Sequence, residues 1–384
     1  MRLLVDGIFY QLARTGIARV WSSLLPRLAA CPDIEITMLD RGGCPDILGI
    51  RRVEFPSYTW NNTAADSLLI DTFAKELNSD VFTSTYYTTP TTIPSVLMVY
   101  DMIPEVLGFD LSTRAWKEKE IAISFARYYA CISANTRSDL IELYPSIAPE
   151  RAIVTHCGLD VASFRPRSVD EVAAFRASFA ISKPYFVLVG SREQHTGYKN
   201  AGLLFEALRT MKRQPLHVLC IGGEPEIQPH FLEGLPSGVT VQKLDLTDDQ
   251  LSCAYAGAEA LVYPSLYEGF GMPVIEAMAC GCPVITTQLG SLGEVAGDAA
   301  VFISGRDKDE LGEAMALVRH PAQRLEIVER GLRQANSFSW NPMAREFHRL
   351  LGQAIAESQT PRGQDFLRKW ARLRSIQAEV DVGI

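Results

Sequence analysis

The sequence predicts an α/β protein with two Rossmann-like parallel-sheet domains in tandem, facing a central cleft, and with a C-terminal helical segment. Two observations support this fold class. Short apolar runs of strand length alternate with amphipathic stretches of helix length from end to end, which is typical of a parallel sheet covered by helices. The alternation is interrupted at residues 164–168, a polar stretch that contains Pro166, and 384 residues are enough for more than one domain.

The first predicted domain covers residues 1–166. Its strands are expected where apolar residues run together over a few positions, at Arg2–Asp6, Glu35–Leu39, Val81–Thr85, Val96–Tyr100, Tyr129–Ser133 and Ile153–His156. Its helices are expected where apolar residues recur at helical spacing, at Gly16–Leu28, Ala64–Leu77, Thr113–Tyr128 and Thr136–Leu143.

The second predicted domain covers residues 167–340 and begins with the charged helix Val169–Phe179. Its strands are expected at Tyr185–Val189, Leu216–Ile221, Val239–Leu244, Ala260–Tyr263, Val284–Thr286 and Ala300–Ile303. Its further helices are expected at Ala201–Met211, Asp249–Ala256, Met272–Ala279 and Glu310–Val318. In parallel α/β sheets ligands bind outside the carboxyl ends of the strands, so we expect the site there, in the cleft between the domains.

The remaining segment, 341–384, is expected to form C-terminal crossover helices and a tail. From residue 361 onward, apolar residues recur at helical spacing with basic residues between them, namely Phe366, Leu367, Trp370 and Leu373 with Arg368, Lys369, Arg372 and Arg374. Such a helix either packs on its own protein, which we favour, or lies on an anionic membrane surface.

Composition and charge exclude several classes of protein. A net charge of −8 and a pI of about 5.4 argue against nucleic-acid binding. No apolar stretch approaches the roughly 20 residues that cross a bilayer, and the N-terminus lacks a signal-peptide pattern. The eight cysteines lie mostly in apolar segments, and the close pair Cys280 and Cys282 has no second pair to complete a zinc site. We therefore expect a cytoplasmic protein, peripheral at the inner membrane face if the last helix contacts lipid.

The stretch 264–279 carries the most specific pattern in the chain. It follows the predicted strand Ala260–Tyr263 and places Glu268 before a glycine-rich turn and Glu276 inside the next helix. Pro273 suits the first turn of that helix, where no N–H is needed. Backbone amides and a positive helix N-terminus then face one spot, which suits a polyhydroxylated ligand with phosphate. The plainer alternative is a pair of acids that only complement the helix dipole.

A second pattern lies between the strand Tyr185–Val189 and the helix Ala201–Met211. The strand is followed by Gly190, and Arg192 and Lys199 come before the helix begins. Guanidinium can fork onto two phosphate oxygens, and ammonium acts as a point charge. Because a helix dipole disfavours a cation at its N-terminus, Lys199 there indicates a bound anion, although a solvated basic loop is the simpler interpretation.

Together, these patterns resemble the retaining GT-B glycosyltransferases of family 4, also called glycosyltransferase group 1 and mannosyltransferase-like. The family signature is an acid, seven residues and a second acid around Glu-Gly-Phe-Gly-hydrophobic-Pro, which residues 268–276 match without a gap. The resemblance runs from residue 2 to about residue 355 and is densest over 184–303. It implies that 1–166 is the acceptor domain and 167–340 the nucleotide-sugar donor domain.

The resemblance implies transfer of a hexose, with retention at the anomeric carbon, from a nucleotide-diphosphate sugar to an acceptor hydroxyl. GDP-mannose is the favoured donor, and the expected acceptor is a glycan or a lipid-linked glycan in surface polysaccharide synthesis. No cofactor and no metal are expected, because Arg192 and Lys199 would neutralise the diphosphate. Two alternatives stay open: another double-Rossmann enzyme such as a sugar-nucleotide epimerase or a phosphorylase, and a non-catalytic sugar-nucleotide-binding scaffold.

The resemblance also assigns site residues in both domains. The expected catalytic residues are Glu268, Lys199, Arg192 and Asp101. The residues expected to hold the nucleotide sugar are Gly16, Arg192, Lys199, Leu244, Glu268, Gly269, Phe270, Gly271 and Glu276. In this pattern Glu268 and the amides of Phe270 and Gly271 hold the sugar hydroxyls, and Glu276 accepts hydrogen bonds from the ribose.

The matches in the first domain depart from the family pattern. The turn before the first helix has one glycine, Gly16, where many relatives have two, and Arg14 and Arg19 beside it could contact acceptor or phosphate. Tyr100 stands where many relatives have histidine, and a tyrosine hydroxyl carries no charge near neutral pH. Asp101 either orients a substrate or caps its own loop.

Overall fold

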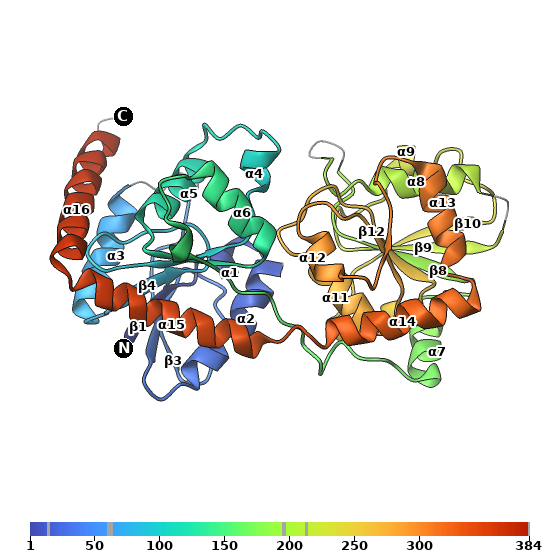
Figure 1. The fold of residues 1–384 in the computed structure, drawn as a ribbon, viewed down its shortest axis with the longest axis horizontal. Helices are drawn as coiled ribbons and strands as arrows, with labels where there is room; N and C mark the ends of the chain where they lie inside the picture. The colour runs from blue at the N-terminus through green and yellow to red at the C-terminus, as the bar shows by residue number, and fades with distance from the viewer. Residues whose placement is uncertain (14–15, 60–63, 194–196, 212–213, 383–384) are drawn as a thin grey trace. The chain divides into compact units, whose positions relative to one another are not determined.

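The computed structural model describes residues 1–13, 16–59, 64–193, 197–211 and 214–382 (Figure 1). The chain forms two compact units. The first unit consists of Met1–Cys157 together with Trp340–Ile384, and the second is Gly158–Ser339. The last segment of the chain therefore belongs to the same unit as the first.

In the described part of the first unit, seven parallel strands form two sheets. One sheet has the order β3-β2-β1-β4, with β1 Arg2–Asp6, β2 Glu35–Asp40, β3 Ile50–Glu54 and β4 Val81–Ser84. The other has the order β5-β6-β7, with β5 Val96–Val99, β6 Tyr128–Cys131 and β7 Ala152–Val154. A parallel bridge between Phe82 and Ser95 joins them at β4 and β5.

Helices surround these strands. They are α1 Ile8–Leu12, α2 Gly16–Ala29, α3 Ala64–Glu76, α4 Ile103–Val106, α5 Arg114–Phe125, α6 Ala134–Leu143, the short 3-10 turn Pro149–Arg151, α15 Trp340–Ser358 and α16 Pro361–Val382. Helix α15 packs beside α2, where Phe347 meets Trp21 edge to face at 5.7 Å. Both rings are buried, so the last segment completes the core of the first unit.

The second unit has one parallel sheet with the order β10-β9-β8-β11-β12-β13. Its strands are β8 Tyr185–Val189, β9 Leu216–Ile221, β10 Val239–Leu244, β11 Ala260–Tyr263, β12 Val284–Thr286 and β13 Val301–Phe302. Its helices are α7 Val169–Ser178, α8 Ala201–Thr210, α9 Pro229–Leu232, α10 Asp248–Ala256, α11 Met272–Ala279, α12 Leu292–Ala296, α13 Lys308–Leu317 and α14 Pro321–Ala335.

The chain changes direction across this sheet between β8 and β11. After β8 it builds outward through β9 and β10, and it then returns to place β11 on the other side of β8. The helices that follow β8 and β11, α8 and α11, therefore lie on opposite faces of the sheet. The loops that lead to them start side by side at the carboxyl ends of the two neighbouring strands. Such a switch point opens a crevice at the end of the sheet, where α/β proteins bind their ligands.

The predicted α/β fold class with parallel sheets is confirmed, and most predicted strands and helices lie within a few residues of the observed ones. Strand β3 was not predicted, because it is an edge strand in which Arg51, Arg52 and Glu54 are exposed. The units also divide at Cys157 rather than at residue 166. Residues after 157 pack on the second unit, where Phe164 lies 6.5 Å from the Tyr255 ring.

A buried ion-pair network lies where β1 and β2 end. Arg41 donates hydrogen bonds of 2.8 Å to each carboxylate oxygen of Asp6 and binds Asp66 at 2.8 Å. Thr88 donates to Asp6 at 2.7 Å, and the Arg41 guanidinium lies 4.4 Å from the Phe55 ring centroid. Burial opposes the charge of Arg41, but Asp6 and Asp66 raise its pKa well above the usual value. Each charge is therefore tolerated in the core only because the others are present.

Arg41→Ala is expected to lower the free energy of unfolding by about 3–5 kcal/mol, because it leaves the Asp6 carboxylate buried and unpaired. The measurement is urea unfolding followed by circular dichroism. The matched control is Arg51→Ala, which removes an exposed arginine of β3 and should change stability by less than about 0.5 kcal/mol. A cost for Arg41→Ala no larger than that of the control would contradict this account of the network.

Candidate functional site

The candidate site lies at the switch point of the second unit, where the loops after β8 and β11 meet. Lys199, from the first loop, donates a hydrogen bond of 2.7 Å from Nζ to Oε1 of Glu268, from the second. It also donates to the Tyr263 hydroxyl at 3.0 Å. Ser265 donates to the same Glu268 oxygen at 2.7 Å. The structure thus joins the two predicted patterns in one hydrogen-bonded cluster.

Residues 198–200, directly before α8, are held in a conformation that presents Lys199. Asn200 adopts a left-handed conformation with φ of 54°, and its side-chain amide donates to the carbonyls of Pro264 and Gly305 at 3.1 and 2.7 Å. The amide of Leu266 donates to the carbonyl of Tyr198 at 2.7 Å. Asparagine tolerates the left-handed region better than most residues, so this position both turns the chain and ties the two loops together.

The turn that carries Glu268 is held from behind by the loop after β12. Ser291 donates from its hydroxyl to the carbonyls of Glu268 and Phe270 at 2.8 and 2.9 Å. Gly290 approaches so closely that an added Cβ would lie 2.9 Å from the Glu268 nitrogen. Gly271 begins α11 with φ of 97°, and a Cβ there would lie 2.8 Å from Leu292. A side chain at either glycine would therefore displace the turn.

The electrostatics of the cluster keep Lys199 charged. Burial opposes the charge, but the Glu268 carboxylate raises the Lys199 pKa well above its usual value. The side chain of Lys199 is 22% exposed, and that of Glu268 is 9% exposed. An ammonium has three N–H donors, and among the described residues two of them have acceptors. One N–H of Lys199 therefore remains for an anion that enters the site.

Arg192 is placed differently from the prediction of an open phosphate fork. It is 2% exposed, and its guanidinium donates to the carbonyls of Gly222, at 2.8 Å, and Glu224, at 2.5 Å. The Glu224 carboxylate accepts from the Arg192 amide at 2.7 Å and lies 3.6 Å from the guanidinium. Only its Nε–H is buried without a partner in the described part of the chain. Arg192 therefore holds the loop after β9 against the loop after β8.

The other predicted residues of the second unit lie at or near the same sheet edge. Phe270 is buried and meets Phe338 edge to face at 5.5 Å. Glu276 lies within α11 and is 2% exposed. Leu244 ends β10, and its carbonyl accepts from the amide of Gly222 at 3.2 Å. Gly269 lies between Glu268 and Phe270 in the turn.

The predicted residues of the first unit have local roles. The carboxylate of Asp101 accepts a hydrogen bond of 3.0 Å from the Ile103 amide, which is the loop-capping alternative. Tyr100 is buried; its hydroxyl donates to the Thr85 carbonyl at 3.0 Å and accepts from Trp21. Gly16 begins α2, and an added Cβ would touch nothing within 4 Å. Arg14, beside it, lies outside the described residues.

Three residues of the site were missed by sequence reasoning. Tyr263 ends a strand that reads as purely apolar, yet its hydroxyl is a partner of Lys199. Ser265 and Ser291 are small polar residues in loops, where serine is common and does not by itself indicate a binding site. A signal was present for Tyr263, which ends a predicted strand, and for Ser265, which lies in the patterned stretch 264–279.

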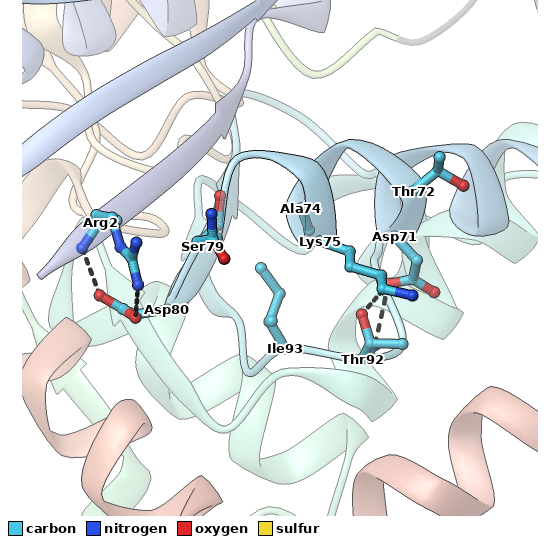
Figure 2. Close-up of a pocket in the computed structure, with 10 residues that line it drawn as sticks. Arg2, Asp71, Thr72, Ala74, Lys75, Ser79, Asp80, Thr92 and Ile93 are labelled. Carbon is cyan, nitrogen blue, oxygen red and sulfur yellow. Dashed lines mark hydrogen bonds and ion pairs between the residues drawn. The ribbon is translucent and has the colours of Figure 1, made fainter.

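A cavity in the first unit is not part of this site. It has a volume of about 550 Å³ and lies at the amino ends of β1 and β4, the edge of the sheet opposite to the carboxyl ends (Figure 2). Its carboxylate Asp71 already accepts hydrogen bonds from the amides and hydroxyls of Thr91 and Thr92. The lining residues are Arg2, Asp71, Thr72, Ala74, Lys75, Asn78, Ser79, Asp80, Thr92 and Ile93.

Comparison with known proteins places the site in a family. Residues 183–319 match the family described as glycosyl transferases group 1. The chain is 30% identical over 227 residues to the O-antigen chain mannosyltransferase B of Escherichia coli, covering 57% of this chain and 58% of that protein. It is 30% identical over 251 residues to the D-inositol 3-phosphate glycosyltransferase of Salinispora tropica, covering 59% and 52%. The matched part thus spans just over half the length of these relatives.

Solved structures show the fold. The sucrose-phosphate synthase of Thermosynechococcus elongatus superposes with a TM-score of 0.72 at 17% identity, covering 93% of this chain and 99% of that one. HepE of Anabaena, in complex with UDP-glucose, superposes with a TM-score of 0.71 at 15% identity, covering 92% and 100%. The switch-point cluster lies within the matched residues 183–319. Residues 183–319 are therefore similar to the group 1 glycosyltransferases, and the chain has the GT-B fold of the solved structures.

Proposed function

We propose that the chain is a retaining glycosyltransferase that moves a hexose from a nucleotide-diphosphate sugar to an acceptor hydroxyl. GDP-mannose is the proposed donor, and a glycan or lipid-linked glycan of a surface polysaccharide is the proposed acceptor. The single observation that carries the proposal is the pairing of Lys199 with Glu268 at the switch point. Two of the relatives are named as mannosyltransferases, which favours mannose.

In this proposal Lys199 neutralises the leaving diphosphate. Cleavage of the sugar–phosphate bond builds negative charge on the diphosphate, and a fixed cation lowers that barrier. Lys199 keeps its proton because Glu268 raises its pKa, and it has one N–H left among the described contacts for a phosphate oxygen. Lys199 would then bind both the diphosphate and Glu268. The Glu268 carboxylate would accept further hydrogen bonds from the sugar hydroxyls.

Arg192 has a second proposed role at the same place. Its guanidinium is held by backbone carbonyls of the loop after β9, so its positive charge is fixed close to the switch point without being solvated. A fixed buried charge acts on a nearby anion over several ångströms, because the low dielectric of the interior screens it weakly. Direct binding of Arg192 to the diphosphate would need the loop after β9 to release it.

For the sugar transfer itself we propose attack on the same face that the diphosphate leaves. The carboxylate of Glu268 is bound by Lys199 and Ser265, which suits a binding residue better than a nucleophile that forms a covalent intermediate. The leaving phosphate would then take the acceptor proton. Metal independence is part of the same proposal, since Lys199 and Arg192 supply the positive charge that a divalent ion would otherwise provide.

One observation favours a second candidate, a binder of sugar nucleotides without turnover. The hydroxyl of Tyr100, which stands where many relatives have histidine, is buried, donates to Thr85 and accepts from Trp21 within the first unit. Its one proton is therefore not available to a donor sugar in this arrangement. Binding of a nucleoside diphosphate together with the absence of any transfer or donor hydrolysis would favour this candidate.

The test of the proposed function is calorimetric titration with GDP, UDP, ADP and TDP, each with and without EDTA, followed by transfer assays with the matching sugars. We expect micromolar affinity for one nucleotide, GDP in the favoured case, unchanged by the chelator. The configuration of the product, read by NMR, tests retention. Loss of binding in EDTA would contradict metal independence, and failure of every nucleotide to bind would contradict the donor site.

Lys199→Ala is expected to lower turnover at least about tenfold, or by roughly 1.4 kcal/mol of transition-state stabilisation or more. The reason is that the leaving diphosphate loses the cation that neutralises its growing negative charge. The measurement is kcat and KM with the identified donor. The matched control is Lys308→Ala, which removes a lysine that is 42% exposed at the start of α13 and should leave both constants unchanged. Wild-type turnover in Lys199→Ala would rule out the diphosphate role.

Glu276→Ala is expected to weaken nucleoside diphosphate binding at least about fivefold even when no sugar is attached, because the proposed contact is to the ribose. Titration calorimetry measures this directly. Glu313→Ala serves as the control, since Glu313 is an exposed glutamate on α13 of the same unit. If the affinity of Glu276→Ala equals that of the control, Glu276 has no role in holding the ribose.

A further inference from the structure

Helix α16 carries an exposed apolar stripe. Leu373, Ile376 and Val380 are 58%, 49% and 57% exposed. Their spacing of three and four residues places them on one face of the helix. Single exposed apolar residues, such as Leu325 on α14 at 62%, are ordinary on protein surfaces. Three such residues in a row on one helix face form a continuous surface, which we call the α16 stripe.

The face of α16 next to the stripe is anchored in the first unit, where α16 lies beside α3 (Figure 1). Arg374 is 2% exposed and binds Glu118 at 2.7 Å and the Ser67 hydroxyl at 2.9 Å. The ring of Trp370 meets Phe125 edge to face at 5.5 Å. The buried ion pair and the contact of Trp370 with the buried Phe125 ring both fix the rotation of the helix. The α16 stripe therefore lies along the flank of the packed face, where its side chains are about half exposed.

Basic side chains border the α16 stripe. Arg368 and Lys369 are 75% and 72% exposed, and Arg372 is exposed one turn before Ile376. The acid Asp365 lies 3.5 Å from Arg368 and 2.7 Å from Lys369 and offsets one of these charges. Toward the end of the helix Glu379 is the exposed acid beside Val380. The N-terminal two-thirds of this face is thus cationic, although the whole chain carries a net charge of −8.

We propose that the α16 stripe and its basic border dock on the surface of a membrane that contains anionic lipids. Apolar side chains on one helix face enter the boundary between headgroups and acyl chains, and neighbouring Lys and Arg are attracted by anionic headgroups. Among the helices of the described residues, none is long and apolar enough to cross a bilayer, so the contact is interfacial. A second copy of the chain is the weaker partner, because the cationic borders of two stripes repel each other. The proposal is independent of the proposed function.

The test is co-sedimentation of the full chain with vesicles of phosphatidylcholine alone and of phosphatidylcholine with phosphatidylglycerol. We expect binding to the anionic vesicles at least about tenfold tighter than to the neutral ones, and weaker binding as salt is raised. The double variant Leu373→Glu/Ile376→Glu should lose that binding at least about tenfold. The matched control Leu325→Glu places the same charge at an exposed leucine of α14 and should bind as the wild type does.

A charge-reversal variant tests the border separately. Lys369→Glu/Arg372→Glu should weaken binding to anionic vesicles and leave the thermal unfolding midpoint unchanged, because both side chains are exposed. Sedimentation velocity of wild type and Leu373→Glu/Ile376→Glu then distinguishes lipid docking from self-association. The proposal is overturned if the wild type ignores anionic vesicles or binds both vesicle types equally. It is also overturned if the stripe variants bind like the control, or if they only dissociate a dimer.

Discussion

The ion pair between Lys199 and Glu268 is the interaction on which the site depends. It joins the loop after β8 to the loop after β11, the two loops that diverge at the switch point of the second sheet. Asn200, Ser265 and Ser291 hold those loops through hydrogen bonds to backbone carbonyls and to Glu268. The side chain of Lys199 is partly exposed, and in our proposal it therefore shares its ammonium between Glu268 and an anionic, polyhydroxylated ligand.

Much of the fold and the centre of the site could be predicted from the sequence. Buried parallel strands appear in the sequence as short apolar runs. The spacing from Glu268 to Glu276 is also visible in the sequence, because it depends only on residues close together in the chain. The edge strand β3 could not be predicted from an apolar run, because an edge strand can carry polar side chains on both faces. In β3 these are Arg51, Arg52 and Glu54. The partners of Arg192 could not be read either. They are backbone carbonyls of a loop about thirty residues away, and carbonyls carry no sequence signal.

The first unit shows the same limit for charged residues. Arg41 reads as an ordinary loop arginine, yet it is buried between Asp6 and Asp66 because β1, β2 and α3 bring these residues together. Tyr100 reads as a site residue by its position, yet its hydroxyl is satisfied inside the core. In both cases tertiary packing decides the role, and the same packing orients α16 through Arg374.

The most direct test of the central claim is hydrogen exchange of the backbone amides with and without the nucleoside diphosphate that binds. We expect slower exchange in peptides that cover residues 190–200 and 265–276, because the proposed ligand bridges the loops after β8 and β11. Little change is expected at residues 85–106 of the first unit when no sugar or acceptor is present. Protection confined to the first unit, or unchanged exchange in both loops at saturating nucleotide, would contradict the assignment of the switch point as the donor site.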